Sequence, residues 1–417
     1  MRWLYDFSIF LYSTGIRMAA LFGHPKAKLA IQGRKNWRKE LQSKLSGAEK
    51  RIWVHCASLG EFEQGRPLIE RLRTQFPSEQ IVLTFFSPSG FEIRKNYSGA
   101  DCVCYLPFDS KSNARDFIRI VNPEFTCFIK YDYWFHYLNE LSRRQINSYF
   151  IAAIFRKDQL FFKSYGSFYR RMLKLVHHFF LQDESSAQLL KEININRFSV
   201  CGDTRFDRVI KIADTTEAIP LLEKFRVPGK TLIAGSTWPD DEKLLADAFS
   251  ILKKSGMKLI VVPHDPSPAH VIRIQETFST ILQSTEIKKI SEADDQSWNA
   301  KLIIIDRIGI LSAAYRSADF AFIGGGFGKG VHNTLEAAVY GIPIFTGPNY
   351  NKFLEIRELM QSGAATCVRS GTELAGKIQY FLSNPEEYKA KGQLASGYVR
   401  SRAGATERIM NHLSRNS

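Results

Sequence analysis

The chain alternates short apolar segments with longer stretches of helical periodicity, and the alternation runs in two successive series. Short apolar runs bounded by turn residues indicate β-strands. Strands that alternate with helices form parallel sheets, because a parallel pair needs a crossover connection. The pattern therefore predicts an α/β protein with one parallel sheet from each series. The predicted strands are residues 51–54, 80–84, 103–106, 125–129, 148–154, 179–182 and 198–200, then 230–234, 258–262, 301–305, 320–323 and 342–345.

The two series are separated by a segment without a strong strand pattern. Ala213 to Pro228 contains Pro220 and Pro228, and Gly229 follows directly. A chain of 417 residues also exceeds what a single core usually fills. We expect two Rossmann-like domains facing a cleft, with ligands beyond the carboxyl ends of the strands. The predicted division is 1–35 for an amino-terminal helix and basic collar, 36–212 for the first domain, and 213–417 for the second, with the last helix packing back on the first.

A glycine-rich stretch, Gly324 to Gly330, follows the predicted strand at 320–323 and leads into His332, Asn333 and Glu336. Glycines let the backbone approach a ligand, and a helix that follows turns the positive end of its dipole toward phosphate. We therefore expect a nucleotide site, with Glu336 accepting from ribose hydroxyls. The glycine spacing fits neither the dinucleotide fingerprint nor the P-loop. The alternative is an ordinary strand-to-helix turn with a capping asparagine.

The turn after the first predicted strand, His55 to Glu61, places a carboxylate at a predicted helix start. The helix dipole keeps Glu61 ionised there, and such a group can take a proton from an incoming hydroxyl. Helix capping is the structural alternative for Glu61, since acids are favoured in any first turn. Glu63 competes for either role.

The second domain carries further candidate loops after its strands. Gly235-Ser236-Thr237 can hold phosphate through backbone N–H groups and hydroxyls, although a plain helix cap explains it nearly as well. Pro263-His264 and the run from Asp306 to Leu311 also follow strands and can border the same site.

The amino terminus and the charge of the chain indicate an anionic membrane surface. The net charge is +15, and residues 3–22 are mostly apolar and aromatic. An amphipathic helix followed by a basic collar suits the cytoplasmic face of an acidic membrane, whereas a buried helix of the soluble core is the alternative. A charge inside the apolar segment argues against a cleaved signal peptide. The polar stripe of the helix is Arg2, Asp6, Ser13, Arg17 and His24, and the collar is Lys26, Lys28, Arg34, Lys35, Arg38, Lys39 and Lys44.

These motifs together resemble one family, the transferases of 3-deoxy-D-manno-octulosonate (Kdo), which move Kdo from CMP-Kdo onto lipid A precursor at the inner membrane. The resemblance implies a GT-B glycosyltransferase fold, and it is specific because the motifs span nearly the whole chain in family order. The matching elements are Ala57 to Glu61, Gly202 to Asp207, Gly235 to Thr237, Asp306 to Leu311, Gly324 to Glu336, and Asn351-Lys352-Phe353.

The resemblance also implies roles for single residues. Glu61 matches the catalytic base and Arg205 a basic residue that stabilises the transition state. Pro263 and His264, the segment Gly309, Ile310 and Leu311, and the segment Asn333, Thr334, Leu335 and Glu336 match positions that bind CMP. Further candidates are Ser58, Gly60, Gly235, Ser236, Thr237 and His332.

The chain departs from the family pattern at three places. Lys130-Tyr131-Asp132 stands where the family has two glutamates, so the role at Lys130 is open and Asp132 is expected to keep that of the second carboxylate. Gly202-Asp203-Thr204-Arg205 replaces a Gly-Asn-x-Lys motif. His264 stands where an arginine is expected after Pro263.

The expected reaction is an inverting single displacement on lipid IVA in lipopolysaccharide core biosynthesis, at the cytoplasmic face of the inner membrane. No acid cluster suggests a metal, the six cysteines are scattered and expected to be reduced, and no cofactor is expected beyond the donor CMP-Kdo. Another GT-B sugar-nucleotide transferase or epimerase is the enzymatic alternative. A nucleic-acid partner is not expected, because the basic residues lack the aromatic interleaving of a single-strand groove.

Overall fold

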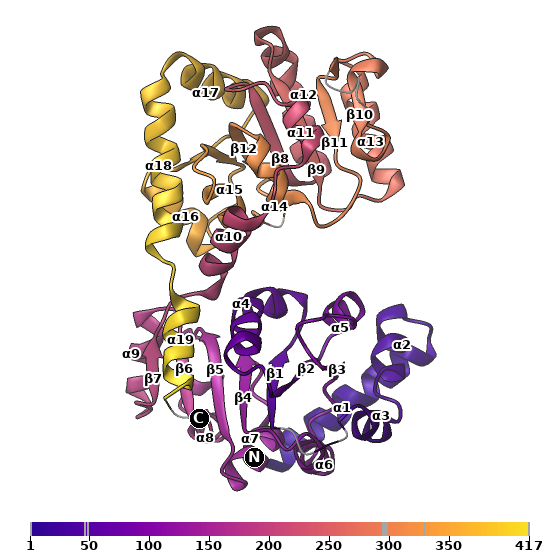
Figure 1. Cartoon of the computed structure of the whole chain (residues 1–417), viewed down its shortest axis with the longest axis vertical. Helices are drawn as coiled ribbons and strands as arrows, with labels where there is room; N and C mark the ends of the chain where they lie inside the picture. The colour runs from indigo at the N-terminus through magenta and orange to yellow at the C-terminus, as the bar shows by residue number, and fades with distance from the viewer. Residues whose placement is uncertain (1, 46, 48–49, 294–298, 329, 416–417) are drawn as a thin grey trace. The chain divides into compact units, whose positions relative to one another are not determined.

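The computed structural model describes residues 2–45, 47, 50–293, 299–328 and 330–415. The chain forms two compact units, Met1–Arg208 with Ala403–Ser417, and Val209–Arg402 (Figure 1). The division falls inside helix α10 (Thr204–Thr215), slightly before the boundary expected at 212/213. The last helix, α19 (Ala405–Leu413), packs on α4 (Leu59–Gln75) of the first unit.

The first unit is built on a seven-stranded parallel sheet in the order β3-β2-β1-β4-β5-β6-β7. All six residues of β1 are buried, which explains why these strands appear in the sequence as apolar runs without alternation. The predicted strands of the first series are confirmed to within two residues at each end. They are β1 (Arg51–Cys56), β2 (Gln80–Phe85), β3 (Cys102–Tyr105), β4 (Phe125–Ile129), β5 (Asn147–Ala153), β6 (His178–Leu181) and β7 (Phe198–Val200).

The second unit repeats this plan with the order β10-β11-β9-β8-β12-β13-β14, again all parallel. Five strands were predicted, and two were missed because Ile287-Lys288-Lys289 and Ala365-Thr366-Cys367 lack an apolar run. The strands are β8 (Thr231–Thr237), β9 (Lys258–Pro263), β10 (Ile287–Lys289), β11 (Leu302–Ile304), β12 (Phe320–Ile323), β13 (Ile344–Thr346) and β14 (Ala365–Cys367).

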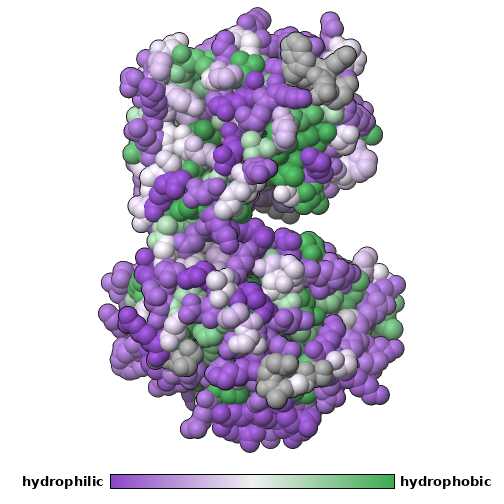
Figure 2. Space-filling view, viewed as in Figure 1, coloured by the Kyte–Doolittle hydropathy of each residue, from purple (hydrophilic) through white to green (hydrophobic). Residues whose placement is uncertain are grey.

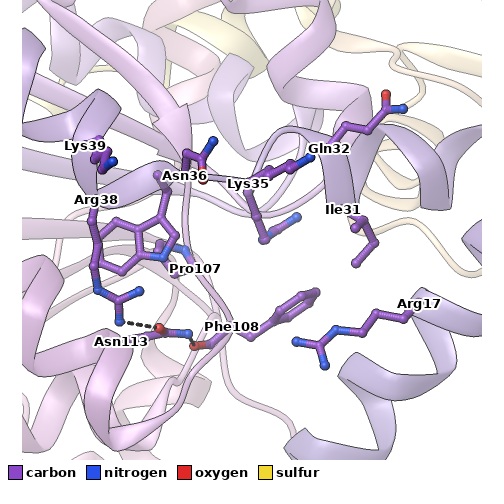
Figure 3. A pocket seen from close by; sticks show the side chains of 12 residues that line it. Arg17, Ile31, Gln32, Lys35, Asn36, Arg38, Lys39, Pro107, Phe108 and Asn113 are labelled. Carbon is purple, nitrogen blue, oxygen red and sulfur yellow. Dashed lines mark hydrogen bonds between the residues drawn. The ribbon is translucent and has the colours of Figure 1, made fainter.

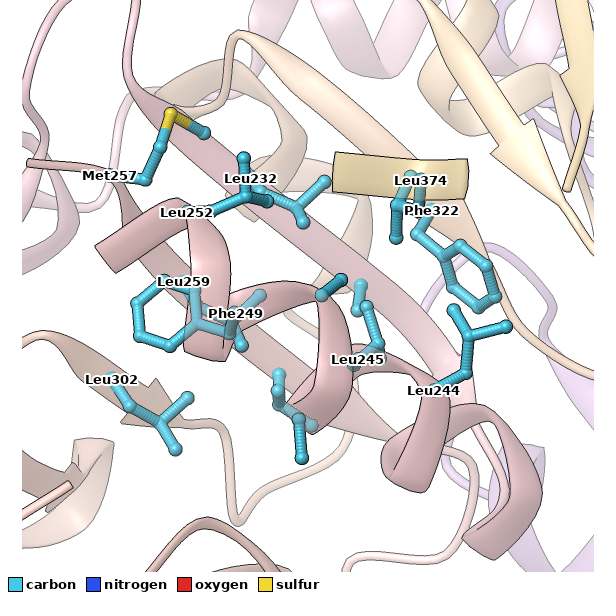
Figure 4. Packing of buried hydrophobic residues seen from close by; sticks show 14 of the residues in the cluster. Leu232, Leu244, Leu245, Phe249, Leu252, Met257, Leu259, Leu302, Phe322 and Leu374 are labelled. Atoms are coloured by element: carbon cyan, nitrogen blue, oxygen red, sulfur yellow. The ribbon is translucent and has the colours of Figure 1, made fainter. Parts of the chain in front are cut away.

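Helices cover both sheets and bury their apolar faces against them. In the second unit, Leu245 and Phe249 of α12 (Pro239–Leu252) pack with Leu232 of β8 and Leu259 of β9 in one core cluster (Figure 4). Hydrophilic residues cover most of the visible face of each unit (Figure 2). The predicted helix at 3–22 is confirmed as α1 (Arg2–Leu21), and no helix among the described residues is long and apolar enough to cross a membrane.

The remaining α-helices are short to medium in length. In the first unit they are α2 (Pro25–Gln32), α3 (Trp37–Lys44), α5 (Pro88–Arg94), α6 (Lys111–Val121), α7 (Phe135–Arg143), α8 (Ser167–Lys174) and α9 (Glu184–Glu192). In the second they are α11 (Pro220–Phe225), α12 (Pro239–Leu252), α13 (Pro268–Ser279), α14 (Leu311–Ala314), α15 (Leu335–Ala338), α16 (Leu354–Gln361), α17 (Gly371–Ser383) and α18 (Pro385–Ser401). Short 3-10 turns lie at Leu160–Phe162, Lys253–Ser255, Ser284–Glu286, Ile290–Glu292 and Tyr315–Ser317.

Each sheet has a topological switch point, where the strand order reverses direction. In the first sheet the chain moves outward from β1 through β2 to β3 and then returns to place β4 on the other side of β1. In the second sheet β8 and β12 hold the corresponding positions. Ligands of open parallel sheets bind beyond the carboxyl ends of the strands at such points. The loops that follow β1, β4, β8 and β12 are therefore where a site is expected.

Candidate active site

The turn after β1 holds Glu61 in the first turn of α4. Ser58 caps this helix, because its hydroxyl accepts from the backbone N–H of Gly60, 3.2 Å away. The Ser58 hydroxyl also donates a short hydrogen bond to Glu61 Oε2. The cap is thus made by Ser58, and the half-buried Glu61 carboxylate lies near the positive end of a 17-residue helix. In this position the Glu61 carboxylate is a candidate to accept a proton from a hydroxyl.

Glu63, the competing carboxylate, is held in ion pairs. Its Oε1 accepts from Arg94 Nη2 at 2.7 Å, and its Oε2 pairs with Arg208 Nη1. Arg208 Nη1 also donates to the Glu63 backbone carbonyl, 3.0 Å away. Two guanidinium groups therefore hold Glu63, which leaves Glu61 as the better candidate for a base.

The loop after β4 holds Asp132 beside a buried histidine. His55 Nε2 lies 3.1 Å from Asp132 Oδ2, and His55 Nδ1 lies 2.8 Å from Thr84 Oγ1. Trp53 Nε1 donates to the same Thr84 hydroxyl at 2.8 Å. All these groups are satisfied if Thr84 donates to His55 Nδ1 and His55 Nε2–H donates to Asp132. His55 thus orients Asp132, a role that the sequence analysis missed because its only local signal is one histidine inside an apolar strand.

Glu61 and Asp132 lie close to the same buried thiol. The pKa of Cys56 is raised, first by burial and then by the negative charges of Glu61 and Asp132. Since Cys56 is the last residue of β1, the two carboxylates converge at the switch point between β1 and β4. Lys130, which directly follows β4, has a left-handed backbone with φ of 69°. Such a conformation is unusual for a non-glycine residue and is common at functional loops.

Arg205 lies in the first turn of α10 and is held by Asp203. Its Nε donates to Asp203 Oδ2 at 2.8 Å, and its backbone N–H donates to Oδ1 at 2.9 Å. Asp203 Oδ1 also accepts from Gln64 Nε2 at 2.8 Å. Because Gln64 follows Glu61 by three residues on α4, this chain of contacts places Arg205 on the side of the first unit that carries Glu61. The acidic Asp203, which stands in place of an expected asparagine, thus gives Arg205 a partner.

The glycine loop of the second unit follows β12, but the helix after it differs from the prediction. That helix was expected to begin near His332, whereas α15 begins at Leu335 and has only four residues. His332 and Asn333 therefore lie in the loop, and the prediction of a helix start at His332, with its dipole directed at phosphate, is wrong. Lys329 lies outside the described residues.

Backbone packing makes two of the loop glycines necessary. A Cβ at Gly324 would lie 2.4 Å from the carbonyl oxygen of Ser236, and Gly325 has φ of 88°. The N–H of Gly325 donates to Asp241 Oδ2 at 2.8 Å, and burial raises the pKa of Asp241 to about 6. Asp241 thus joins the start of α12 to the glycine loop. No local sequence motif predicts this contact.

Three rings from three separate loops stack at the carboxyl edge of the second sheet. The ring centroids of Trp238 and His264 lie 4.7 Å apart, and those of His264 and His332 lie 4.5 Å apart. Trp238 Nε1 donates to His332 Nε2 at 2.8 Å, so this nitrogen carries no proton in that geometry. Burial and the neighbouring His264 lower the pKa of His332 in the same direction. Pro263, directly before His264, is buried at the end of β9.

Glu336 joins two predicted CMP-binding segments. Its Oε1 accepts from Asn333 Nδ2 at 2.8 Å, and its Oε2 accepts from the Ser312 hydroxyl. Ser312 follows the segment Gly309, Ile310 and Leu311, which the structure therefore brings to Asn333 and Glu336. Thr334 and Leu335 are buried and support the turn through packing.

The loop after β8 presents mainly backbone groups, and few free side chains, to the candidate site. A Cβ at Gly235 would meet the Tyr315 hydroxyl, and Ser236 has φ of 55°. The Thr237 hydroxyl is buried and donates to Glu242 Oε1 at 2.9 Å, which in turn is paired with His270. The Thr237 hydroxyl is thus engaged within the protein, which does not support its expected contact with phosphate. Within the described ranges, no group of His, Cys, Asp and Glu side chains is arranged to hold a metal ion.

Residues 32–208 match the family model described as 3-deoxy-D-manno-octulosonic-acid transferase (kdotransferase). The 3-deoxy-D-manno-octulosonic acid transferase of Aquifex aeolicus is 26% identical over 354 residues, covering 83% of this chain and 90% of that protein. The transferase of the same name from Chlamydophila psittaci is 25% identical over 427 residues, covering 99% and 96%.

Among solved structures, the UDP-GlcNAc 2-epimerase of Neisseria meningitidis covers 88% of this chain and 100% of its own. Its TM-score is 0.61 at 16% sequence identity, so this likeness concerns the fold alone. It agrees with the expected α/β fold of the GT-B type with two Rossmann-like domains. The resemblance to the Kdo transferase family is thus confirmed over nearly the whole chain, and the homology indicates a glycosyltransferase.

Proposed function

We propose that this chain transfers Kdo from CMP-Kdo to a lipid A precursor, lipid IVA, in lipopolysaccharide core biosynthesis. The observation that carries the proposal is Glu61, an acid in the first turn of a helix at the switch point of a sheet, beside a second carboxylate. The names of the relatives supply the sugar. The proposed substrates also agree with the net charge of +15, because donor and acceptor are both anionic.

In the proposed mechanism the first unit activates the acceptor. Glu61 takes the proton from an acceptor hydroxyl as its oxygen attacks the anomeric carbon of Kdo, and the bond from that carbon to the CMP phosphate breaks. A single displacement of this kind inverts the configuration. Asp132, oriented by His55, and Arg205, oriented by Asp203, would position the acceptor and stabilise the developing charge.

The second unit would hold the nucleotide. Glu336 would accept from the ribose hydroxyls, and the loops after β8 and β12 would receive the departing phosphate. His264 and His332 would add ring N–H donors beside it. The proposal assigns these tasks to protein groups and needs no metal or resident cofactor.

The test is incubation of the full chain with CMP-Kdo and tetraacylated lipid A precursor, followed by mass measurement of the lipid. We expect a product heavier than the acceptor by the mass of Kdo. Transfer from a UDP-sugar with no transfer from CMP-Kdo would favour another sugar-nucleotide transferase and overturn the proposal.

Replacement of Asp132 by Asn tests the second carboxylate. The amide keeps a partner for His55 but removes the charge, so we expect kcat to fall about tenfold, in the range that a charged hydrogen bond contributes. Affinity for CMP should be unchanged, because Asp132 belongs to the other unit. Wild-type kcat in this variant would remove Asp132 from the mechanism.

We further propose that the protein works at the cytoplasmic face of the inner membrane, with α1 at the lipid surface. Part of the polar stripe contacts the protein, since Asp6 Oδ1 lies 2.6 Å from His136 Nε2 and Ser13 is buried, whereas Arg2 and Arg17 of the stripe are exposed. Tyr5 of α1 also packs on the protein, against Phe135, but many large apolar side chains of the helix are exposed: Trp3 is 69% exposed, Phe10 60% and Leu21 80%. The exposed apolar side chains are available to a bilayer, which supports the proposed location of α1.

Triple replacement of Phe7, Phe10 and Leu11 by Gln tests this membrane location without disturbing the polar contacts of α1. We expect at least a tenfold loss of binding to acidic vesicles at high salt, because burial of each such side chain contributes about 1.5–3 kcal/mol. Vesicle sedimentation measures the effect. Unchanged sedimentation at high salt would show that another surface is the anchor.

A further inference from the structure

A basic cavity of about 860 Å³ lies between α1, the turn from α2 to α3, and the loop after β3. Figure 3 shows Arg17 of α1, Lys35 of the turn and Phe108 of the loop pointing toward a common space. Five basic side chains line the cavity, and no acidic side chain is among its described lining residues. The basic residues are Arg17, Arg34, Lys35, Arg38 and Lys39.

Arg34 is a buried cation without a carboxylate partner among the described residues. Its Nε, Nη1 and Nη2 donate to the backbone carbonyls of Leu106, Ala30 and Phe86 at 2.8, 2.9 and 2.6 Å. These bonds use three of the five N–H groups of a guanidinium. Burial lowers the pKa of Arg34 only to about 10, so the group remains charged at neutral pH. A buried charge that meets only carbonyl dipoles and aromatic faces favours an anion nearby.

The other cations of the cavity are available to a ligand. The side chains of Arg17, Lys35 and Lys39 are exposed, and no ion pair is found for them in the described part of the chain. Arg38 alone is paired, with Asp116 at 2.9 Å and with Asn113 at 3.1 Å. The cavity therefore concentrates positive charge around an open volume.

The shape and the surroundings of the cavity favour a lipid over a free anion. Ile31, Trp37, Pro107 and Phe108 form an apolar wall that a phosphate ion alone would leave uncovered. Arg17 belongs to α1, whose apolar side is exposed. Basic side chains next to an exposed apolar helix are typical of proteins that bind a membrane surface.

We propose that this cavity binds the phosphodiester headgroup of one anionic glycerophospholipid, whose acyl chains leave along the apolar side of α1. Lipid should then bind at one discrete, saturable site, in addition to the non-specific electrostatic attraction between the basic collar and an acidic membrane. The inference rests on the proposed membrane location and is independent of the transfer reaction.

The experiment is calorimetric titration of the full chain in neutral detergent with dihexanoyl phosphatidylglycerol. We expect one saturable site, and at least tenfold weaker binding in Lys35→Ala/Lys39→Ala. The matched control is Lys26→Ala/Lys28→Ala, which removes the same charge from the collar at exposed residues that do not line the cavity and should bind within twofold of wild type. Dihexanoyl phosphatidylcholine should bind at least tenfold more weakly than the anionic lipid.

Four results would overturn the proposal. Equal weakening by both double variants would indicate a diffuse electrostatic surface, and equal affinity for the zwitterionic lipid would indicate apolar contact alone. Inorganic phosphate that binds as tightly as the lipid would indicate an ion site. Binding of tetraacylated lipid A precursor with none of phosphatidylglycerol would make the cavity part of an acceptor site. Transfer activity enters none of these readouts, so failure here is distinguishable from failure of the proposed function.

Discussion

Replacement of Glu61 by Gln is expected to lower the rate of transfer by roughly 10²–10⁴-fold, the range that general bases contribute. Glutamine is isosteric and can still accept a hydrogen bond from Ser58, so the turn and the helix start should be preserved. Only the ability to take a proton is lost. Affinity for CMP should be nearly unchanged, because the nucleotide is assigned to the other unit.

Glu63→Gln is the matched control for Glu61→Gln, since the two acids lie on the same helix. Glu63 is held by Arg94 and Arg208, so its replacement should cost some stability and leave most of the transfer activity. Initial rates with CMP-Kdo and lipid acceptor measure both variants. A Glu61→Gln protein that retains more than about a tenth of the wild-type rate would remove Glu61 as the base. An inactive Glu63→Gln protein beside an active Glu61→Gln protein would transfer the role to Glu63.

Most strands of the two sheets were predictable because they are largely buried on both faces. Burial of this kind favours a largely apolar run, as in β4, where all five residues are buried and only Thr126 is polar. The edge strand β10 was missed because two of its three residues are lysines. A strand this short shows neither an apolar run nor an alternation of apolar and polar residues. The start of α15 was misplaced for a related reason: a four-residue helix leaves no periodicity to find.

The candidate site was predictable wherever a motif is local in sequence. Ser58, Gly60 and Glu61 lie within four residues, and their roles in one helix start follow from that spacing. The contacts between loops were not predictable. The bond from His55 to Asp132 joins residues 77 positions apart, and the stack of His264 on His332 joins two different strand ends. Such contacts depend on strand order, which the sequence pattern does not specify.

The orientation of α1 shows the same limit. The helical projection separates a polar stripe from an apolar side, but it does not say which side meets the protein. The structure places Asp6 against His136 at the start of α7 and Tyr5 against Asp109 in the loop after β3, and it leaves Phe10 exposed. These tertiary contacts decide which side of α1 faces the protein, and the helical projection does not contain them.

Replacement of Glu336 by Ala is expected to weaken CMP binding about tenfold to hundredfold, the range for loss of hydrogen bonds to a charged group. Ser312 and Asn333 hold the Glu336 carboxylate in place between two loops, so it is already oriented for a diol. Its removal also leaves both neighbours without their acceptor. Calorimetry with CMP measures the loss.

Ser312→Ala is the control that separates binding from positioning. It removes one of the two groups that orient Glu336 and keeps the carboxylate, so CMP affinity should fall by no more than about fivefold, as one neutral-to-charged hydrogen bond is replaced by water. UMP should compete poorly with CMP in the wild type. Unchanged CMP affinity in Glu336→Ala would remove Glu336 from the nucleotide site, and tighter binding of UMP than of CMP would favour a uridine-nucleotide enzyme on the same fold. Because neither result depends on Glu61, the two replacements test the two units of the chain separately.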